Sequence, residues 1–147
     1  MSDVWPNSYQ KLVSFSQRTK NSTYVSEENH CKHIAFNNDR DYVYHIKIDG
    51  GVIPKECNLT KRIDFLLLNE TKKTAYLIEL KGCHIEDAFV QLEVSHEHLQ
   101  PLLIGYVIHW RLVHRSRTSN LKTNRVNKYL REHHRLQVQE TPMKEPI

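Results

Sequence analysis

The sequence predicts a mixed α/β domain, and three features of its middle part carry that prediction. Residues 42–48 alternate apolar and polar side chains, and two short apolar runs follow at 63–68 and 74–80, as is typical of strands. Segment 86–100 then repeats apolar residues at spacings of three, four and seven, like an amphipathic helix, and a strand-like run at 102–113 comes next. A helix between two strands predicts a crossover connection and a mixed sheet.

The two ends of the chain complete the expected order of elements. The first 40 residues predict mostly helix, with Asn7 or Ser8 as a cap and a second short helix over residues 26–34. Towards the C-terminus, residues 122–133 predict a helix and residues 136–138 a last short strand. The expected order is therefore helix, three strands, helix, strand, helix, strand.

Length and composition set limits on the class of protein. A chain of 147 residues with 39% hydrophobic and 26% charged residues suits a single folded domain, expected over residues 1–140. Residues 141–147, with two prolines and no periodicity, predict a flexible C-terminal tail. No apolar run is long enough for a transmembrane helix, no secretory signal is evident, and three sparse cysteines are typical of reduced thiols. We expect a cytoplasmic, nucleoid or nuclear protein that is not secreted, with no membrane partner and no organic cofactor.

The charge is strongly segregated along the chain. Between Arg111 and Arg135 there are eight basic residues and one acid, whereas residues 82–100 hold four acids and neither lysine nor arginine. A basic stretch of this density suits a phosphate backbone, although an exposed, solvated surface would give the same pattern. The residues expected to contact nucleic acid are Arg115, Arg117, Lys122, Arg125 and Lys128.

Three charged residues, Asp64, Glu79 and Lys81, lie inside or beside the two apolar runs. Charged side chains are rarely buried unless they are paired, so their presence there calls for an explanation. Glu79 and Lys81, two apart on a strand, share one face. If Thr71 and Lys72 form the centre of the turn, Asp64 lies directly opposite Glu79. Two carboxylates at this distance repel each other unless a cation neutralises them, and Mg²⁺ or Mn²⁺ prefers such oxygen ligands. The alternative is a structural ion network at the ends of two strands.

The pattern resembles the PD-(D/E)XK, or restriction-endonuclease-like, nuclease superfamily. The matching residues are Arg62-Ile63-Asp64-Phe65-Leu66-Leu67-Leu68, then Tyr76-Leu77-Ile78-Glu79-Leu80-Lys81-Gly82, and the helix segment Glu86-Asp87-Ala88-Phe89-Val90-Gln91-Leu92. Ile63 stands where many members have a proline before the first aspartate. The resemblance implies the αβββαβ core of that family, with a central mixed sheet flanked by helices.

The resemblance also implies Mg²⁺- or Mn²⁺-dependent hydrolysis of phosphodiester bonds. Asp64 and Glu79 would bind the metal, with the Leu80 carbonyl and Glu28 of the first helical region, or Glu27 in its place, as further ligands. Lys81 would orient or activate water, and Gln91 matches the glutamine that many members carry on the following helix. The implied substrate is DNA, with RNA as the alternative.

The function expected from the resemblance is that of a small stand-alone endonuclease, which would recognise a DNA structure or a short sequence. Two other classes of function are alternatives to it. One is a catalytically silent nucleic-acid-binding or protein-interaction module on the same fold, and the other is an adaptor whose basic face contacts an acidic protein. The small size of the chain suggests a homodimer that presents two active sites to two strands. Cysteine and histidine spacing shows no paired zinc-ligand motif, so we expect no structural zinc.

Overall fold

A computed structural model describes residues 4–82, 84–115, 124–133 and 135–147, with the side chains of residues 124 and 125 outside the description. The helices are α1 (Tyr9–Val13), α2 (Ile85–Leu99), the 3₁₀ turn η1 (Gln100–Leu102) and α3 (Asn124–Glu132). The strands are β1 (Arg18–Thr19), β2 (Thr23–Glu28), β3 (Cys31–Phe36), β4 (Val43–Lys47), β5 (Phe65–Asn69), β6 (Thr74–Lys81), β7 (Val107–His114), β8 (Leu136–Glu140) and β9 (Met143–Pro146). The expected mixed α/β class is confirmed.

The strands form two sheets. The larger has the order β1-β4-β5-β6-β7-β8; its first four strands are antiparallel neighbours, and β6, β7 and β8 run parallel. The smaller has the order β2-β3-β9, with β9 parallel to β3. The parallel pairs of the larger sheet follow from helical crossovers, because α2 connects β6 to β7 and α3 lies between β7 and β8 in the chain. The six-stranded sheet is therefore mixed, as expected.

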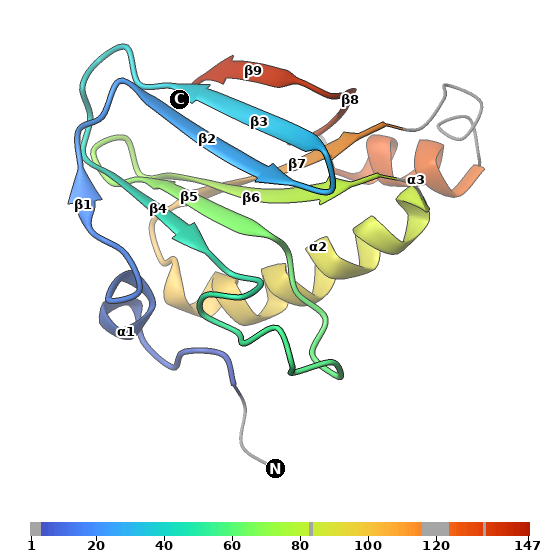
Figure 1. The fold of residues 1–147 in the computed structure, drawn as a ribbon, viewed down its shortest axis with the longest axis horizontal. Helices are drawn as coiled ribbons and strands as arrows, with labels where there is room; N and C mark the ends of the chain where they lie inside the picture. The colour runs from blue at the N-terminus through green and yellow to red at the C-terminus, as the bar shows by residue number, and fades with distance from the viewer. Residues whose placement is uncertain (1–3, 83, 116–123, 134) are drawn as a thin grey trace.

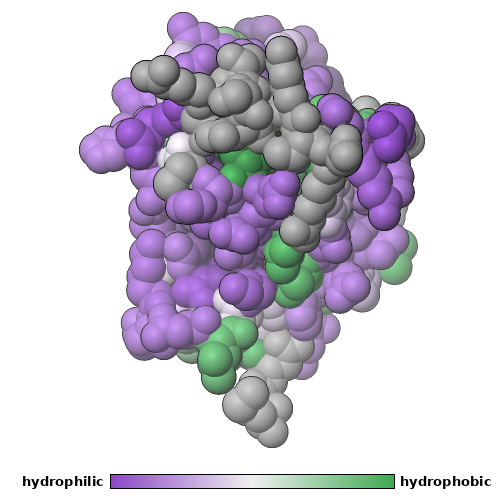
Figure 2. All heavy atoms as spheres, turned by 90° about the vertical axis from the view of Figure 1, so that its right-hand side faces the viewer, coloured by the Kyte–Doolittle hydropathy of each residue, from purple (hydrophilic) through white to green (hydrophobic). Residues whose placement is uncertain are grey.

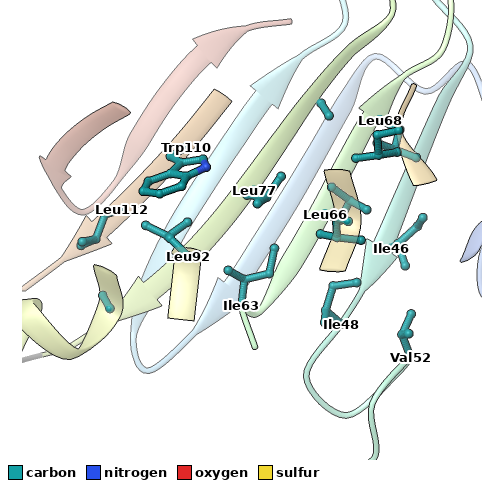
Figure 3. Close-up of a cluster of buried hydrophobic side chains, with 14 of the residues drawn as sticks. Ile46, Ile48, Val52, Ile63, Leu66, Leu68, Leu77, Leu92, Trp110 and Leu112 are labelled. Carbon is teal, nitrogen blue, oxygen red and sulfur yellow. The ribbon is translucent and has the colours of Figure 1, made fainter. Parts of the chain in front are cut away.

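The large sheet is covered on both faces (Figure 1): α2 runs along one face and the small sheet lies over the other. Alternate residues of β6 accordingly enter two different cores. Leu77 packs towards α2 with Phe89 and Leu92, whereas Ile78 packs with Tyr24 of the small sheet. Figure 3 shows the α2-side core, in which apolar side chains of β4, β5, β6 and β7 meet those of α2. Burial on both faces explains why β5 and β6 are nearly continuous apolar runs.

The predicted register of the β5–β6 hairpin is confirmed. Phe65 pairs with Ile78 and Leu66 with Leu77, and the Asp64 amide donates to the Ile78 carbonyl at 3.2 Å. The next step of the same ladder sets Asp64 opposite Glu79.

The expectation of a mostly helical N-terminal region is wrong. The helix there is limited to α1, for which the Ser8 hydroxyl accepts the Lys11 amide as an N-cap, and residues 26–34 form the hairpin of β2 and β3 instead of a helix. Asn29 and His30 form its turn with φ of 53° and 60°, the left-handed conformation that a tight hairpin turn requires. The acidic pair after Ser26 looked like the first turn of a helix, but strand pairing decides the conformation.

The C-terminal expectation is also wrong in one respect. Residues 141–147 contain β9, which pairs with β3, and the Met143 and Ile147 side chains are buried in the core beneath the small sheet. Pairing with a strand more than a hundred residues earlier leaves no periodic signal within seven residues. Among the described residues, no helix is long and apolar enough to cross a bilayer.

Candidate active site

Two buried carboxylates meet where β5 begins and β6 nears its end. Asp64 is 7% exposed and Glu79 is 5% exposed, on the face of the sheet that α2 covers. The Leu80 amide donates to Asp64 Oδ2 at 2.8 Å, and the carboxyl groups of Asp64 and Glu79 are close enough for each to shift the pKa of the other. Glu79 Oε1 is buried and has no hydrogen-bond partner. A buried acceptor without a partner costs stability, so its retention favours a role in binding.

The electrostatics of the pair follow from this burial. Desolvation raises the pKa of Asp64 to about 6; the Leu80 amide opposes that shift, and the negative charges of Asp49 and Glu28 add to it. Desolvation and the charge of Asp64 raise the pKa of Glu79 well above its usual range, which the positive charge of Lys81 partly offsets. The pair therefore holds a proton more readily than isolated carboxyls do, and a bound cation would be an alternative to that proton.

The two carboxylates open into a cavity of about 240 Å³, here called the carboxylate pocket. Its lining residues are Asn29, Asp49, Asn58, Thr60, Lys61, Arg62, Asp64, Glu79, Lys81 and Gln91. Lys81 is half-buried at the end of β6, and its ammonium makes no hydrogen bond or ion pair with the described residues. The Gln91 side chain reaches the pocket from α2, and its Oε1 accepts the Arg62 amide at 2.7 Å. The structure thus brings together Asp64, Glu79, Lys81 and Gln91 as predicted.

The two further metal ligands expected from the resemblance are placed differently. Glu28 ends β2 rather than lying on a helix, and its charge still raises the pKa of Asp64. The Leu80 carbonyl accepts a hydrogen bond from Asn29 Nδ2 at 2.8 Å, which ties the β2–β3 turn to the end of β6. This carbonyl therefore has one lone pair engaged already. The convergence of the β2–β3 turn with the end of β6 can be followed in Figure 1.

Sequence reasoning missed Asp49 and the two cations that bind its carboxylate, Arg62 and Lys55. Asp49 follows β4, and its charge raises the pKa of both Asp64 and Glu79. The Arg62 guanidinium donates to Asp49 Oδ1 from Nε and Nη2, at 3.0 and 2.8 Å, and Lys55 Nζ lies 2.8 Å from Asp49 Oδ2. Asp49 precedes two glycines, so it looked like an ordinary turn residue. The pairing of β4 with β5 is the signal that could have identified Asp49 as a site residue. It sets the end of β4 beside the start of β5, and therefore Asp49 near Asp64.

Arg62 organises the wall of the pocket. Besides binding Asp49, its guanidinium donates to the carbonyls of Cys57 and Thr60, so it holds the loop that joins β4 to β5. Asn58 and Lys61 of this loop line the carboxylate pocket. Five donors on one planar group suit such a task better than a lysine would.

Of the basic residues expected to contact nucleic acid, one lies beside the site. Arg115 is exposed, and its guanidinium passes so close to Gly82 that a Cβ at that position would lie 2.7 Å from Nη2. Lys128 lines a different cavity between α2, α3 and β7, and lies 4.0 Å from Glu132. Arg117 and Lys122, and the side chain of Arg125, lie outside the described residues. Arg111, part of the basic stretch, is buried and ion-paired with Glu145 rather than exposed.

A second hollow adjoins the carboxylate pocket and is here called the outer cavity. It measures about 630 Å³ and is lined by Glu27, Glu28, Asn29, His30, Lys81, Gly82, His84 and Arg115. Lys81 and Asn29 line both spaces, so the two are neighbours. The side of the molecule turned to the viewer in Figure 2 is largely hydrophilic. A polar, partly basic hollow beside two carboxylates can hold an anionic chain next to a cation site.

The donor set fits a hard divalent cation in part. Asp64 and Glu79 supply carboxylate oxygens, and the unpartnered Glu79 Oε1 leaves one of them without a competing bond. Among the described residues, no group of three or more histidine, cysteine, aspartate or glutamate side chains is arranged to hold a metal ion. A two-carboxylate site matches Mg²⁺, which keeps several water ligands and is often completed by substrate phosphate.

Comparison of the chain with protein-family models, with curated proteins and with solved structures finds no match to any of them.

Proposed function

We propose that this protein is a metal-dependent nuclease that hydrolyses phosphodiester bonds of DNA at the carboxylate pocket. The observation that carries the proposal is the burial of two carboxyl groups, Asp64 and Glu79, in the wall of one pocket, where one Glu79 oxygen has no partner and Lys81 also lines the space. Nothing in folding alone favours this arrangement, since burying two like charges together costs stability. Groups retained at such a cost are typical of active sites.

The reaction consumes one water molecule: its oxygen bonds to phosphorus, one P–O ester bond breaks, and the leaving oxygen takes up a proton. When bound, Mg²⁺ or Mn²⁺ supplies Lewis acidity towards phosphate and lowers the pKa of a coordinated water. Asp64 and Glu79 hold the cation. Lys81 donates hydrogen bonds to the scissile phosphate or to the attacking water, and stabilises negative charge that develops on the phosphate oxygens. Arg115, in the outer cavity, binds the neighbouring phosphate of the chain.

The order of elements supports the same proposal. The elements α1, β4, β5, β6, α2 and β7 follow one another in the order αβββαβ, with β1, β2 and β3 between α1 and β4. Asp64 precedes the second of these core strands, Glu79 and Lys81 lie on the third, and Gln91 lies on the helix that follows.

Cleavage of a DNA panel tests the proposal. Linear, supercoiled, single-stranded and branched DNA are each incubated with the protein and Mg²⁺, Mn²⁺ or EDTA, and products are resolved on gels. We expect cleavage with metal and none with EDTA, and Lys81→Ala should lower the rate by about a hundredfold or more, because it removes a charge that acts on the transition state.

The matched control is Lys144→Ala, which removes a lysine from an exposed position of β9 and should leave the cleavage rate unchanged. Equal cleavage by wild type and Lys81→Ala would contradict the proposal, as would the absence of cleavage of both DNA and RNA. In that second case, binding that weakens with salt and is indifferent to Lys81 would identify the silent nucleic-acid-binding module instead.

A further inference from the structure

Acidic side chains surround Lys55, in the loop between β4 and β5. Its ammonium lies 2.8 Å from Asp49 Oδ2 and 3.8 Å from Glu28 Oε1, and the charge of Asp64 also acts on it. Two carboxylates from separate segments, Asp49 and Glu28, therefore lie within 4 Å of one ammonium, and the charge of Asp64 adds to their effect. A small, hard cation is the natural competitor for such a position.

The loop is built to place this side chain. Gly50 has a φ of +87°, and a Cβ there would lie 3.2 Å from Cγ and Cε of Lys55, so the glycine both makes the turn and leaves room for the lysine stem. The Gly50 amide donates to the Ile53 carbonyl at 2.7 Å, which closes the turn that precedes Lys55.

The two oxygens of Asp49 are held in different ways. Oδ1 accepts two hydrogen bonds from Arg62, whose side chain is 11% exposed, whereas Oδ2 is paired with Lys55, whose side chain is 55% exposed. The first contact is part of the loop framework. The second is at the surface and can exchange at little cost, because an exposed lysine is rehydrated when it leaves.

We infer that Asp49 is a third carboxylate ligand of the metal site, and that Lys55 occupies its Oδ2 until a divalent cation displaces it. An acidic cluster alone would not carry this inference. The independent observation is Glu79 Oε1, which is buried, unpartnered and in the wall of the same pocket as Asp49. This inference rests on the proposed function, because that function is what identifies the competing cation as Mg²⁺ or Mn²⁺.

The test is the affinity for Mn²⁺ alone, measured by the electron paramagnetic resonance signal of the free ion, without nucleic acid. Lys55→Gln should bind Mn²⁺ about tenfold more tightly than wild type, because a competing positive charge is gone. Lys55→Arg keeps the charge and should stay near the wild-type affinity. Lys72→Gln is the matched control, since Lys72 pairs with Asp39 and Asp41 elsewhere in the molecule, and should also stay near it.

A double-variant cycle identifies Asp49 as the ligand. Adding Asp49→Asn to Lys55→Gln should cancel the gain in affinity, whereas the same change in wild type should have a smaller effect. Equal Mn²⁺ affinity of wild type and Lys55→Gln, with binding lost in Asp64→Asn, would overturn this inference and leave the proposed function standing. Tighter binding without cleavage of any nucleic acid would support the site and contradict the nuclease. Absence of Mn²⁺ binding in every variant would overturn both.

Discussion

Replacement of Asp64 by asparagine is expected to raise the free energy of unfolding by about 2–3 kcal/mol at pH 8 in EDTA, and to abolish metal-dependent cleavage. The reason is that burial raises the pKa of Asp64 to about 6, so the folded protein carries an unfavourable negative charge above that pH. Asparagine has the same shape and no charge, and its side-chain oxygen still accepts the Leu80 amide. Stability and activity should therefore change in opposite directions.

The sign of the pH dependence follows from the same shift. Below about pH 4 the carboxyl group is protonated in both the folded and the unfolded chain, so the substitution should have little effect there. Between pH 4 and about 6 the unfolded chain loses its proton first, which penalises the folded wild type progressively, and the penalty persists at higher pH, where the charge of Asp64 also opposes the ionisation of Glu79. The gain from Asp64→Asn should thus grow from pH 4 to pH 6.

Urea unfolding of both proteins in EDTA at pH 4.0, 5.0, 6.0 and 8.0 measures this gain, with the sampled pH values chosen around the raised pKa of about 6. Asp39→Asn is the matched control, because Asp39 is 66% exposed and its pairing with Lys72 is solvated, so its removal should cost little at any of these pH values. A gain of equal size at pH 4.0 and pH 8.0, or a loss of stability at pH 8.0, would contradict the assignment of Asp64 as a buried, destabilising charge.

The second large effect concerns the ion network that joins the two sheets. Arg111 of β7 donates from Nε to Glu145 Oε2 at 2.8 Å, and His33 Nε2 lies 2.6 Å from the same oxygen. Burial alone would raise the pKa of Glu145, but the hydrogen bonds from His33 and Arg111 outweigh it and lower that pKa. Because Arg111 and His33 are buried and Glu145 is nearly so, the carboxylate depends on these partners.

Arg111→Met should therefore lower the free energy of unfolding by about 3 kcal/mol or more at pH 7, since it leaves a mostly buried carboxylate without its main cation. The loss should be smaller below pH 4. The reason is that Glu145, whose folded-state pKa is lowered, contributes stability above its ordinary pKa that disappears as the pH falls through the lowered one. Chemical denaturation at both pH values measures the two losses.

Lys128→Met is the control for loss of a basic residue from the same stretch of sequence. Its contact with Glu132 is 4.0 Å long and both side chains are more than half exposed, so the cost should stay below about 0.5 kcal/mol. Adding Glu145→Gln to Arg111→Met should recover part of the lost stability by removing the unpaired charge. If the single variants Arg111→Met and Lys128→Met lose equal stability, the network does not hold the sheets together.

Local pattern was sufficient for the central part of the fold. The alternation in 42–48, the apolar runs of β5 and β6 and the amphipathic α2 each have their own periodicity, and each element was predicted within a few residues. The short polar loop between β5 and β6 restricts their register, which is why the facing of Asp64 and Glu79 was predictable. The strand predicted from Leu102 begins only at Val107, because η1 and a turn with Gly105 at φ +89° take up the first residues.

Long-range pairing decided what the pattern could not. β9 exists because it pairs with β3, and β2 and β3 are strands because their apolar residues pack on β6, so Ser26-Glu27-Glu28 does not start a helix. In each case the free energy comes from residues distant in sequence, which override weak local preferences.

The sequence by itself determined the mixed α/β class, the β5–β6 hairpin and the facing of Asp64 and Glu79, because these depend on periodicity and on one short loop. Only the tertiary structure decided which other charges join them. Asp49, Lys55 and Glu28 come from separate segments whose approach depends on how β4 pairs with β5 and how the small sheet packs on the large one. Likewise, Arg111 and Lys128 belong to one basic stretch, yet packing buries the first and exposes the second, since charge along a chain does not specify which side chains face solvent.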